Sequence, residues 1–157
     1  MTGGGLSRRV QAYLGAHHVM TLATAGDEGP WAAAVFYVHH GWALYFLSAA
    51  ASRHCRNMAQ NPRVSATIQE DYTEWRQIKG IQLEGTATRL SGEEQARARD
   101  LYGAKFPLLR DTARLPAEIA AALASISWYR IAPERAWFVD NSVAFGHRDE
   151  IDLLPHR

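Results

Sequence analysis

The stretch SAAASRHCRNMAQNPRVSATI, residues 48–68, guides the interpretation of the whole chain. Ser52 is a favourable helix N-cap, and the apolar residues that follow it recur on one helical face until Asn-Pro ends the helix. The free N–H groups at a helix N-terminus attract anions, and Arg53 and His54 lie at this one. The segment is therefore either a capped helix with charged neighbours or a binding site for a phosphate group.

Strand-like runs of alternating, β-branched and aromatic residues lie on both sides of this helix. The expected strands are residues 18–25, 31–38, 42–48, 63–69, 78–90, 127–131 and 136–140. Further helices are expected at about 6–17, 92–106 and 116–125. The early strands are joined by turns, so the first three are expected to form a meander, and a turn over 132–135 is expected to join the last two. Gly80 and Gly85 should mark bends or bulges. The pattern predicts a mainly β protein, an antiparallel barrel of about six strands with peripheral helices.

The 157 residues suit a single domain over 1–157, and the glycine-rich start is expected to be a flexible leader over 1–5. A net charge of +1 gives no reason to expect a nucleic-acid or anionic membrane partner. No apolar run approaches the roughly 18 residues of a membrane span. Cys55 is the only cysteine and the N-terminus lacks the apolar core of a signal peptide, so we expect a cytoplasmic protein.

The spacing within residues 45–65 resembles that of a known protein family. Tyr45-Phe46-Leu47-Ser48 ends a strand, Ser52-Arg53-His54 opens a helix, and Asn61-Pro62-Arg63-Val64-Ser65 opens the next strand. This is similar to the phosphate segment of the pyridoxamine 5'-phosphate oxidase-like family of FMN-binding split barrels. The resemblance covers roughly residues 8–140, and the C-terminal part is most similar to a small, functionally uncharacterised bacterial branch of that family.

The resemblance implies that Ser48, Ser52 and Arg53 hold the FMN phosphate, with His54 standing where the oxidases have Lys. A histidine is shorter than lysine and mostly neutral near pH 7, so this departure implies weaker or pH-dependent binding. A flavin-binding Arg of the oxidases falls at about Ala32, which removes another cation. Arg56 is either a replacement for that charge or a solvent-facing helix residue.

The flavin ring is implied to lie along Val35, Phe36 and Tyr37, which are otherwise barrel core. Gln82 is implied to contact the ring, and Lys79 is a competitor for that role that is otherwise simply exposed. Trp137 matches a tryptophan with which the partner subunit closes the site in the family, and its alternative role is ordinary core packing.

The resemblance implies a homodimer with FMN at the subunit interface, acting as a flavin-dependent oxidoreductase on a small-molecule substrate or electron donor. Pyridoxamine phosphate is not the expected substrate, because the family's Arg-x-His pair is absent from residues 145–149. No catalytic acid or base stands out. The alternative is a non-enzymatic protein that binds or senses flavin or haem.

The histidines and Cys55 are further candidates for reactive groups. The pairs His17-His18 and His39-His40 lack the spacing of a zinc site, so no metal site is expected. His147 or His156 is a possible axial haem ligand, as in related split barrels, or a solvated tail residue. Cys55 follows two basic residues, which can activate a thiol, but its helical position also predicts burial.

Overall fold

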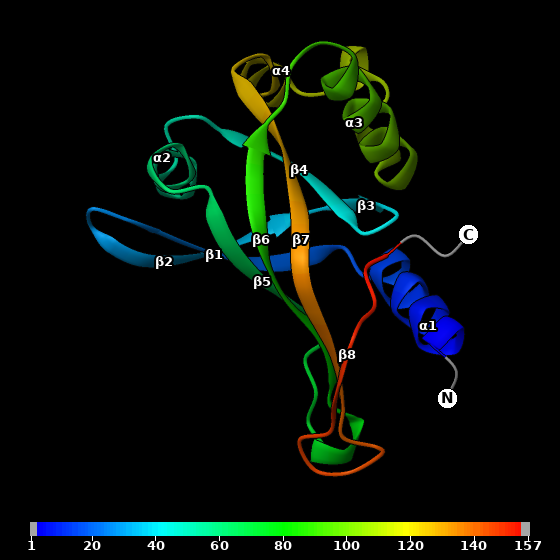
Figure 1. The fold of residues 1–157 in the computed structure, drawn as a ribbon. Helices are drawn as coiled ribbons and strands as arrows, with labels where there is room; N and C mark the ends of the chain where they lie inside the picture. Colours follow the sequence, from blue (N-terminus) through cyan, green and yellow to red (C-terminus); the bar gives the residue numbers. More distant parts are fainter. Residues whose placement is uncertain (1–2, 155–157) are drawn as a thin grey trace.

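The computed structural model describes residues 3–154, which form one antiparallel eight-stranded sheet with helices around it (Figure 1). The helices are α1 (Gly3–Ala16), α2 (Arg53–Gln60), α3 (Gly92–Lys105) and α4 (Ala117–Ala124). The strands are β1 (Val19–Gly26), β2 (Gly29–Phe36), β3 (Val38–His40), β4 (Ala43–Ala49), β5 (Arg63–Gln69), β6 (Lys79–Arg89), β7 (Ile126–Asp140) and β8 (Arg148–Glu150). Short 3-10 turns are η1 (Trp75–Gln77), η2 (Pro107–Leu109) and η3 (Thr112–Arg114).

The strands follow the order β2-β1-β5-β6-β7-β4-β3, and β8 pairs with the C-terminal part of β7, along the stretch of its edge that β4 does not cover. The sheet curls into the expected split-barrel shape, with α3 and α4 beside each other at one end and η1 at the other (Figure 1). The prediction of a mainly β, antiparallel split barrel with peripheral helices is therefore confirmed.

Alternate side chains along the strands point to the inside of the curled sheet and form the hydrophobic core. On β1, Met20 and Leu22 are fully buried, and they pack with Phe46 of β4 and Ile131 of β7. Helix α1 covers this core with Val10 and Leu14, as its spacing predicted, because those side chains recur on one helical face.

The end of α1 is connected to α3 through one lysine. Lys105 Nζ donates to the carbonyl oxygens of Leu14 and His17. Carbonyl groups at a helix C-terminus lack intrahelical donors and carry partial negative charge, so a cation is favourable there. Burial lowers the pKa of Lys105 to about 8.

The expected N-terminal boundary is wrong. Helix α1 begins at Gly3, so Gly3–Gly5 are helical where a leader was expected, and residues 1–2 lie outside the described part. The Arg8 Nε donates to the Gly4 carbonyl at 3.2 Å, a contact between neighbouring helical turns that glycine composition alone does not predict.

The expected meander is also wrong, because β4 does not pair with β2. Strand β4 pairs with β3 on one edge and over six residues with β7 on the other. The buried middle of β4 needs partners on both edges, and the distant strand β7 supplies the second one. Turn chemistry reports only on neighbouring strands and gives no information about this pairing.

The expected turn at residues 132–135 is extended, and β7 is a single strand of 15 residues. Its register with β6 shifts between Glu84 and Gly85, which confirms the expected irregularity at Gly85. A Cβ atom at Gly85 would overlap the Ala132 carbonyl group and crowd Pro133. Because Gly85 has no side chain, β6 can lie close to Ala132 and Pro133, and β7 continues through a β-bulge there instead of ending in a turn.

Candidate functional site

The N-terminus of α2 is built as the sequence predicted. Ser52 is the N-cap in extended conformation, and its Oγ accepts from the Cys55 backbone N–H at 3.4 Å. Cys55 is buried in the core, which agrees with a packing role. Asn57 fixes the helix on β1 by donating to Thr24 Oγ1 at 3.0 Å, and both groups are buried.

The structure brings Ser48, Ser52 and His54 together. The Ser48 hydroxyl at the end of β4 lies 2.7 Å from His54 Nε2, and the Ser52 hydroxyl lies 3.4 Å from the same nitrogen. Burial lowers the pKa of His54, so the ring is neutral at pH 7. We call Ser48, Ser52, Arg53 and His54 the α2 anion site; at neutral pH its charge comes from Arg53.

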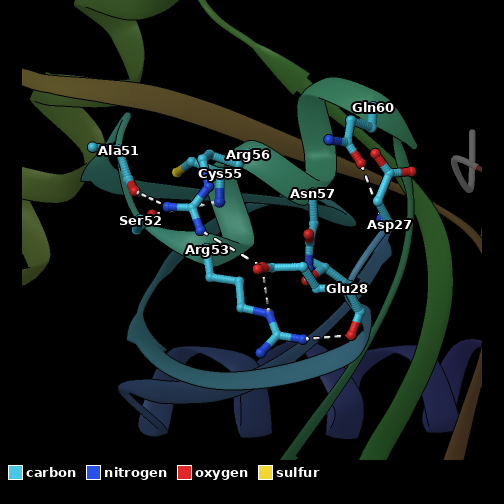
Figure 2. A network of polar contacts seen from close by, with 10 residues as sticks. Asp27, Glu28, Ala51, Ser52, Arg53, Cys55, Arg56, Asn57 and Gln60 are labelled. Carbon is cyan, nitrogen blue, oxygen red and sulfur yellow. Dashed lines mark hydrogen bonds and ion pairs between the residues drawn. The ribbon is translucent and has the colours of Figure 1, made fainter.

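Arg53 reaches across to the tip of the β1–β2 hairpin (Figure 2). Its Nη2 donates to the Glu28 carbonyl at 3.0 Å, and its Nε lies 3.6 Å from the Glu28 carboxylate. The guanidinium carbon lies 4.3 Å from the centre of the Trp31 ring, a cation–π distance. The Arg53 Nε is buried and makes no hydrogen bond within residues 3–154. This donor therefore lacks a hydrogen-bonded acceptor, although the Glu28 carboxylate lies 3.6 Å away from it.

Arg56 joins the same network from the next turn of α2 (Figure 2). Its Nη1 donates to the Ala51 carbonyl at 2.5 Å, and its Nη2 lies 3.8 Å from the Glu28 carboxylate. The Arg56 side chain is exposed to solvent and also close to the α2 anion site. The Glu28 carboxylate therefore lies between the guanidinium groups of Arg53 and Arg56. Sequence reasoning did not identify Glu28 or Trp31, because only the packing of the hairpin on α2 brings them to the site.

The residues expected at the flavin ring lie on two faces of the sheet. Gln82 and Trp137 are register partners on β6 and β7, are half-buried, and lie on the outer face. Register continues that row through Thr67 and Thr21 to Ala34. Alternation along β2 places Phe36, which is 55% exposed, on the same outer face as Ala34.

The remaining three lie on the inner side or at the sheet end. Val35 packs on the core, and Tyr37 is fully buried with its hydroxyl donating to the Leu14 carbonyl at 2.8 Å. Burial raises the pKa of Tyr37, so the hydroxyl is protonated at neutral pH. Lys79 pairs with Asp140 at the end of β6 and alternates away from Gln82.

The histidines in the described part of the chain do not converge on a metal site. No group of three His, Cys, Asp or Glu side chains within residues 3–154 is arranged to hold a metal ion. His17 contacts Glu70, and the ring of His147 lies 2.9 Å from the Asp149 carboxylate. His156 lies outside the described residues.

No helix within residues 3–154 has the length and apolar character needed to cross a lipid bilayer.

Comparisons with known proteins agree with this architecture. A UPF0306 protein from Klebsiella pneumoniae is 30% identical over 138 residues, which cover 87% of this chain and 86% of that protein. A heme binding protein from Mycobacterium smegmatis has a similar structure, with a TM-score of 0.73 and 26% identity, over 98% of this chain and 59% of that one. The heme storage protein HutZ from Vibrio cholerae matches with a TM-score of 0.66 and 22% identity, over 81% of this chain and 89% of that one.

The family comparison covers most of the fold and all four residues of the α2 anion site. The model of the pyridoxamine 5'-phosphate oxidase family matches residues 6–140, which run from α1 to the end of β7. The chain therefore belongs to the pyridoxamine 5'-phosphate oxidase family and is related within it to the UPF0306 proteins.

Proposed function

We propose that this protein binds FMN, with the phosphate at the α2 anion site and the flavin ring on the outer face of the sheet. The observation that carries the proposal is the position of the Glu28 carboxylate between Arg53 and Arg56, at 3.6 and 3.8 Å. A carboxylate held there by two guanidinium groups supports the view that this position accepts anions. The buried Arg53 Nε, which has no hydrogen bond within residues 3–154, is a donor that a phosphate oxygen would satisfy.

The residues of the site fit an anion such as a phosphate. Ser48 and Ser52 offer two hydroxyl groups, and the α2 N-terminus offers backbone N–H groups and a partial positive charge. Arg53 supplies the full charge, held in place by the Glu28 carbonyl and the Trp31 ring. Together these groups would orient the phosphate and fix the position of the rest of the ligand.

Small and half-buried side chains on the outer face fit a planar group. Ala34 on β2 leaves room above the sheet, and Gln82 and Trp137 lie in the same row. In our proposal a second copy of the chain covers this face, so that the flavin lies between subunits and is shielded from water. A bound flavin would supply hydride chemistry at N5, while the protein contributes orientation and hydrogen bonds to the ring.

The proposed activity is that of a flavin-dependent oxidoreductase in the cytoplasm. Its substrate is a small molecule other than pyridoxamine phosphate, because residues 145–149 lack the family's Arg-x-His pair. None of the described groups near Gln82 and Trp137 is singled out as an acid or base, which suits hydride transfer to a flavin. The catalytic residues are therefore left unassigned.

A second candidate, haem binding, is favoured by the similarity to the Mycobacterium smegmatis heme binding protein. His147 would be the ligand, since its ring is half-buried and hydrogen-bonded to Asp149, as metal-binding histidines commonly are. The proposal of FMN differs from this one in requiring Arg53.

Titration of the purified protein with FMN, riboflavin and haemin, followed by absorbance, separates the two candidates. FMN should bind saturably and more tightly than riboflavin, because riboflavin lacks the phosphate. A Soret band that forms with haemin and is lost in His147→Ala, without any response to FMN, would support haem instead. A sedimentation mass of one chain at micromolar concentration would contradict the shared site.

A further inference from the structure

A second cavity lies away from the α2 anion site, between α3, α4 and the neighbouring strands β4 and β7. Its volume is about 930 Å³, and Leu47, Tyr102 and Trp128 form part of its wall. That size lies within the range of roughly 300–1,000 Å³ that is usual for small-molecule sites. Figure 1 shows α3 and α4 side by side at this end of the sheet.

Helix α4 faces the cavity with apolar side chains that the protein does not bury. Its sequence AEIAAALA contains one charged residue, and none of its residues is buried. Ala120, Leu123 and Ala124 line the cavity. A helix of this composition normally buries an apolar stripe against its neighbours. An apolar ligand would complete that contact.

Two aromatic residues of the wall pack against each other and keep their polar ends free for a ligand. Tyr102 is 4% exposed and Trp128 is 6% exposed, and their rings pack edge to face at 5.4 Å. Neither the Tyr102 hydroxyl nor the Trp128 indole N–H makes a hydrogen bond within residues 3–154, and neither is a buried unsatisfied atom, so both polar ends reach solvent. Burial raises the pKa of Tyr102 to about 12, so the hydroxyl is a donor at neutral pH.

The rim of the cavity carries two arginines without ion pairs. Arg99 of α3 and Arg110 after η2 line it, and neither contacts a carboxylate in the described part of the chain. Asp100 is the one acidic residue among the described lining residues. Arg97 on the same helix does have a partner, His40 at 2.6 Å. The rim thus offers positive charge to a ligand.

This cavity is separate from the α2 anion site. Leu47 and Ser48 are neighbours on β4, and successive side chains on a strand point to opposite faces. Leu47 lines the cavity, whereas Ser48 contacts His54. Strand β4 therefore lies between the two, and none of the residues of the α2 anion site lines the cavity.

We propose that the cavity binds an amphipathic carboxylate of the medium-chain fatty acid class. The apolar chain lies between α4 and the wall formed by Leu47 and Trp128, and the carboxylate accepts hydrogen bonds from Arg99 or Arg110. The Tyr102 hydroxyl is a third donor for the carboxylate. The inference is independent of FMN, because it uses different residues.

Calorimetric titration of the full chain with decanoate tests the proposal, and 1-decanol serves as the neutral control of equal chain length. Decanoate should bind saturably and about tenfold or more tightly than 1-decanol, since hydrogen bonds to ionised groups are roughly twice as strong as neutral ones. Arg99→Gln and Arg110→Gln should weaken decanoate binding several-fold and leave 1-decanol unchanged. The matched variant Arg97→Gln, on the same helix but already paired with His40, should bind decanoate like the wild type.

A variant that fills the cavity provides the second test. Ala120→Trp should abolish binding of both ligands while circular dichroism shows a folded protein; if it does not fold, Ala124→Phe replaces it. Arg53→Ala should bind decanoate normally. Absence of saturable decanoate binding, equal affinity for the two ligands, or full binding by the folded Ala120→Trp protein would each overturn the proposal.

Discussion

Glu28 holds Arg53 twice: its carbonyl accepts from Nη2 at 3.0 Å, and its carboxylate lies 3.6 Å from Nε. The tip of the β1–β2 hairpin thus supplies an internal anion to the α2 N-terminus (Figure 2). A phosphate that binds there has to compete with this carboxylate. The affinity of the site therefore depends on Glu28 as well as on the residues of α2.

The variant Glu28→Gln should bind FMN about two- to fivefold more tightly, since an exposed ion pair contributes roughly 0.2–1 kcal/mol. Riboflavin affinity should not change. Asp27→Asn is the matched control, because it removes the same charge from the same hairpin without a contact to Arg53. Fluorescence titration measures both ligands. Weaker FMN binding by Glu28→Gln would show that Glu28 orders Arg53 and does not compete with phosphate.

Removal of the Arg53 guanidinium should weaken FMN about 10- to 100-fold, because hydrogen bonds to charged groups contribute roughly 1.5–3 kcal/mol. Riboflavin should lose less than about twofold in affinity if Arg53 contacts the phosphate. Arg56→Ala is the control on the same helix and should have a smaller effect, as Arg56 is exposed and lies farther from Glu28. Equal losses of FMN and riboflavin in Arg53→Ala would place Arg53 outside the phosphate contact.

Burial lowers the folded-state pKa of His54, which makes stability depend on pH. Below about pH 6.5 the unfolded chain takes up a proton more readily than the folded one, so the free energy of unfolding decreases as pH falls and is unaffected above that range. His54→Gln should reduce this loss between pH 8 and about pH 5, while burial of His39 leaves part of it. Urea unfolding at both pH values measures the difference. His18→Gln, at an exposed histidine, is the control, and an equal reduction there would contradict the assignment.

The proposed dimer predicts an effect of Phe36, which is 55% exposed on the outer face of β2. A glutamate there should shift the sedimentation mass toward one chain, since burying a charge at an interface is unfavourable. Val143→Glu alters a residue that is 60% exposed in the β7–β8 loop and should leave the mass unchanged. An unchanged mass in Phe36→Glu would place the interface elsewhere.

The helix cap at Ser52 and the strand over 63–69 were predictable, because each depends only on residues that are close to it in the sequence. The pairing of β4 with β7 was not, since the two strands are far apart in the sequence and a strand's alternation does not name its partner. The same limit applies to the site. The cap position together with the family resemblance predicts Arg53, but its partners Glu28 and Trp31 lie on a hairpin that reaches it only in the folded chain.

At the Gly85 bulge one local sequence signal predicts the structure correctly and a neighbouring one does not. Glycine within an apolar strand indicated an irregularity, and the register shift lies there. Pro133 favours a turn in the sequence, because proline lacks the N–H of a regular ladder. In the structure the bulge accommodates it, so β7 continues to Asp140 and carries Trp137 to its place beside Gln82.

Gly85→Ala should therefore destabilise the protein by about 2 kcal/mol or more, because the new methyl group would overlap the Ala132 backbone and neither strand can move freely. Gly15→Ala is the matched control: its Cβ would lie 3.6 Å from His39 Nε2, an ordinary contact, and alanine in a helix gains roughly 0.5–1 kcal/mol over glycine. Urea unfolding compares the two variants with the wild type. Equal stability of Gly85→Ala and wild type would mean that β6 and β7 pair without the close approach at this bulge.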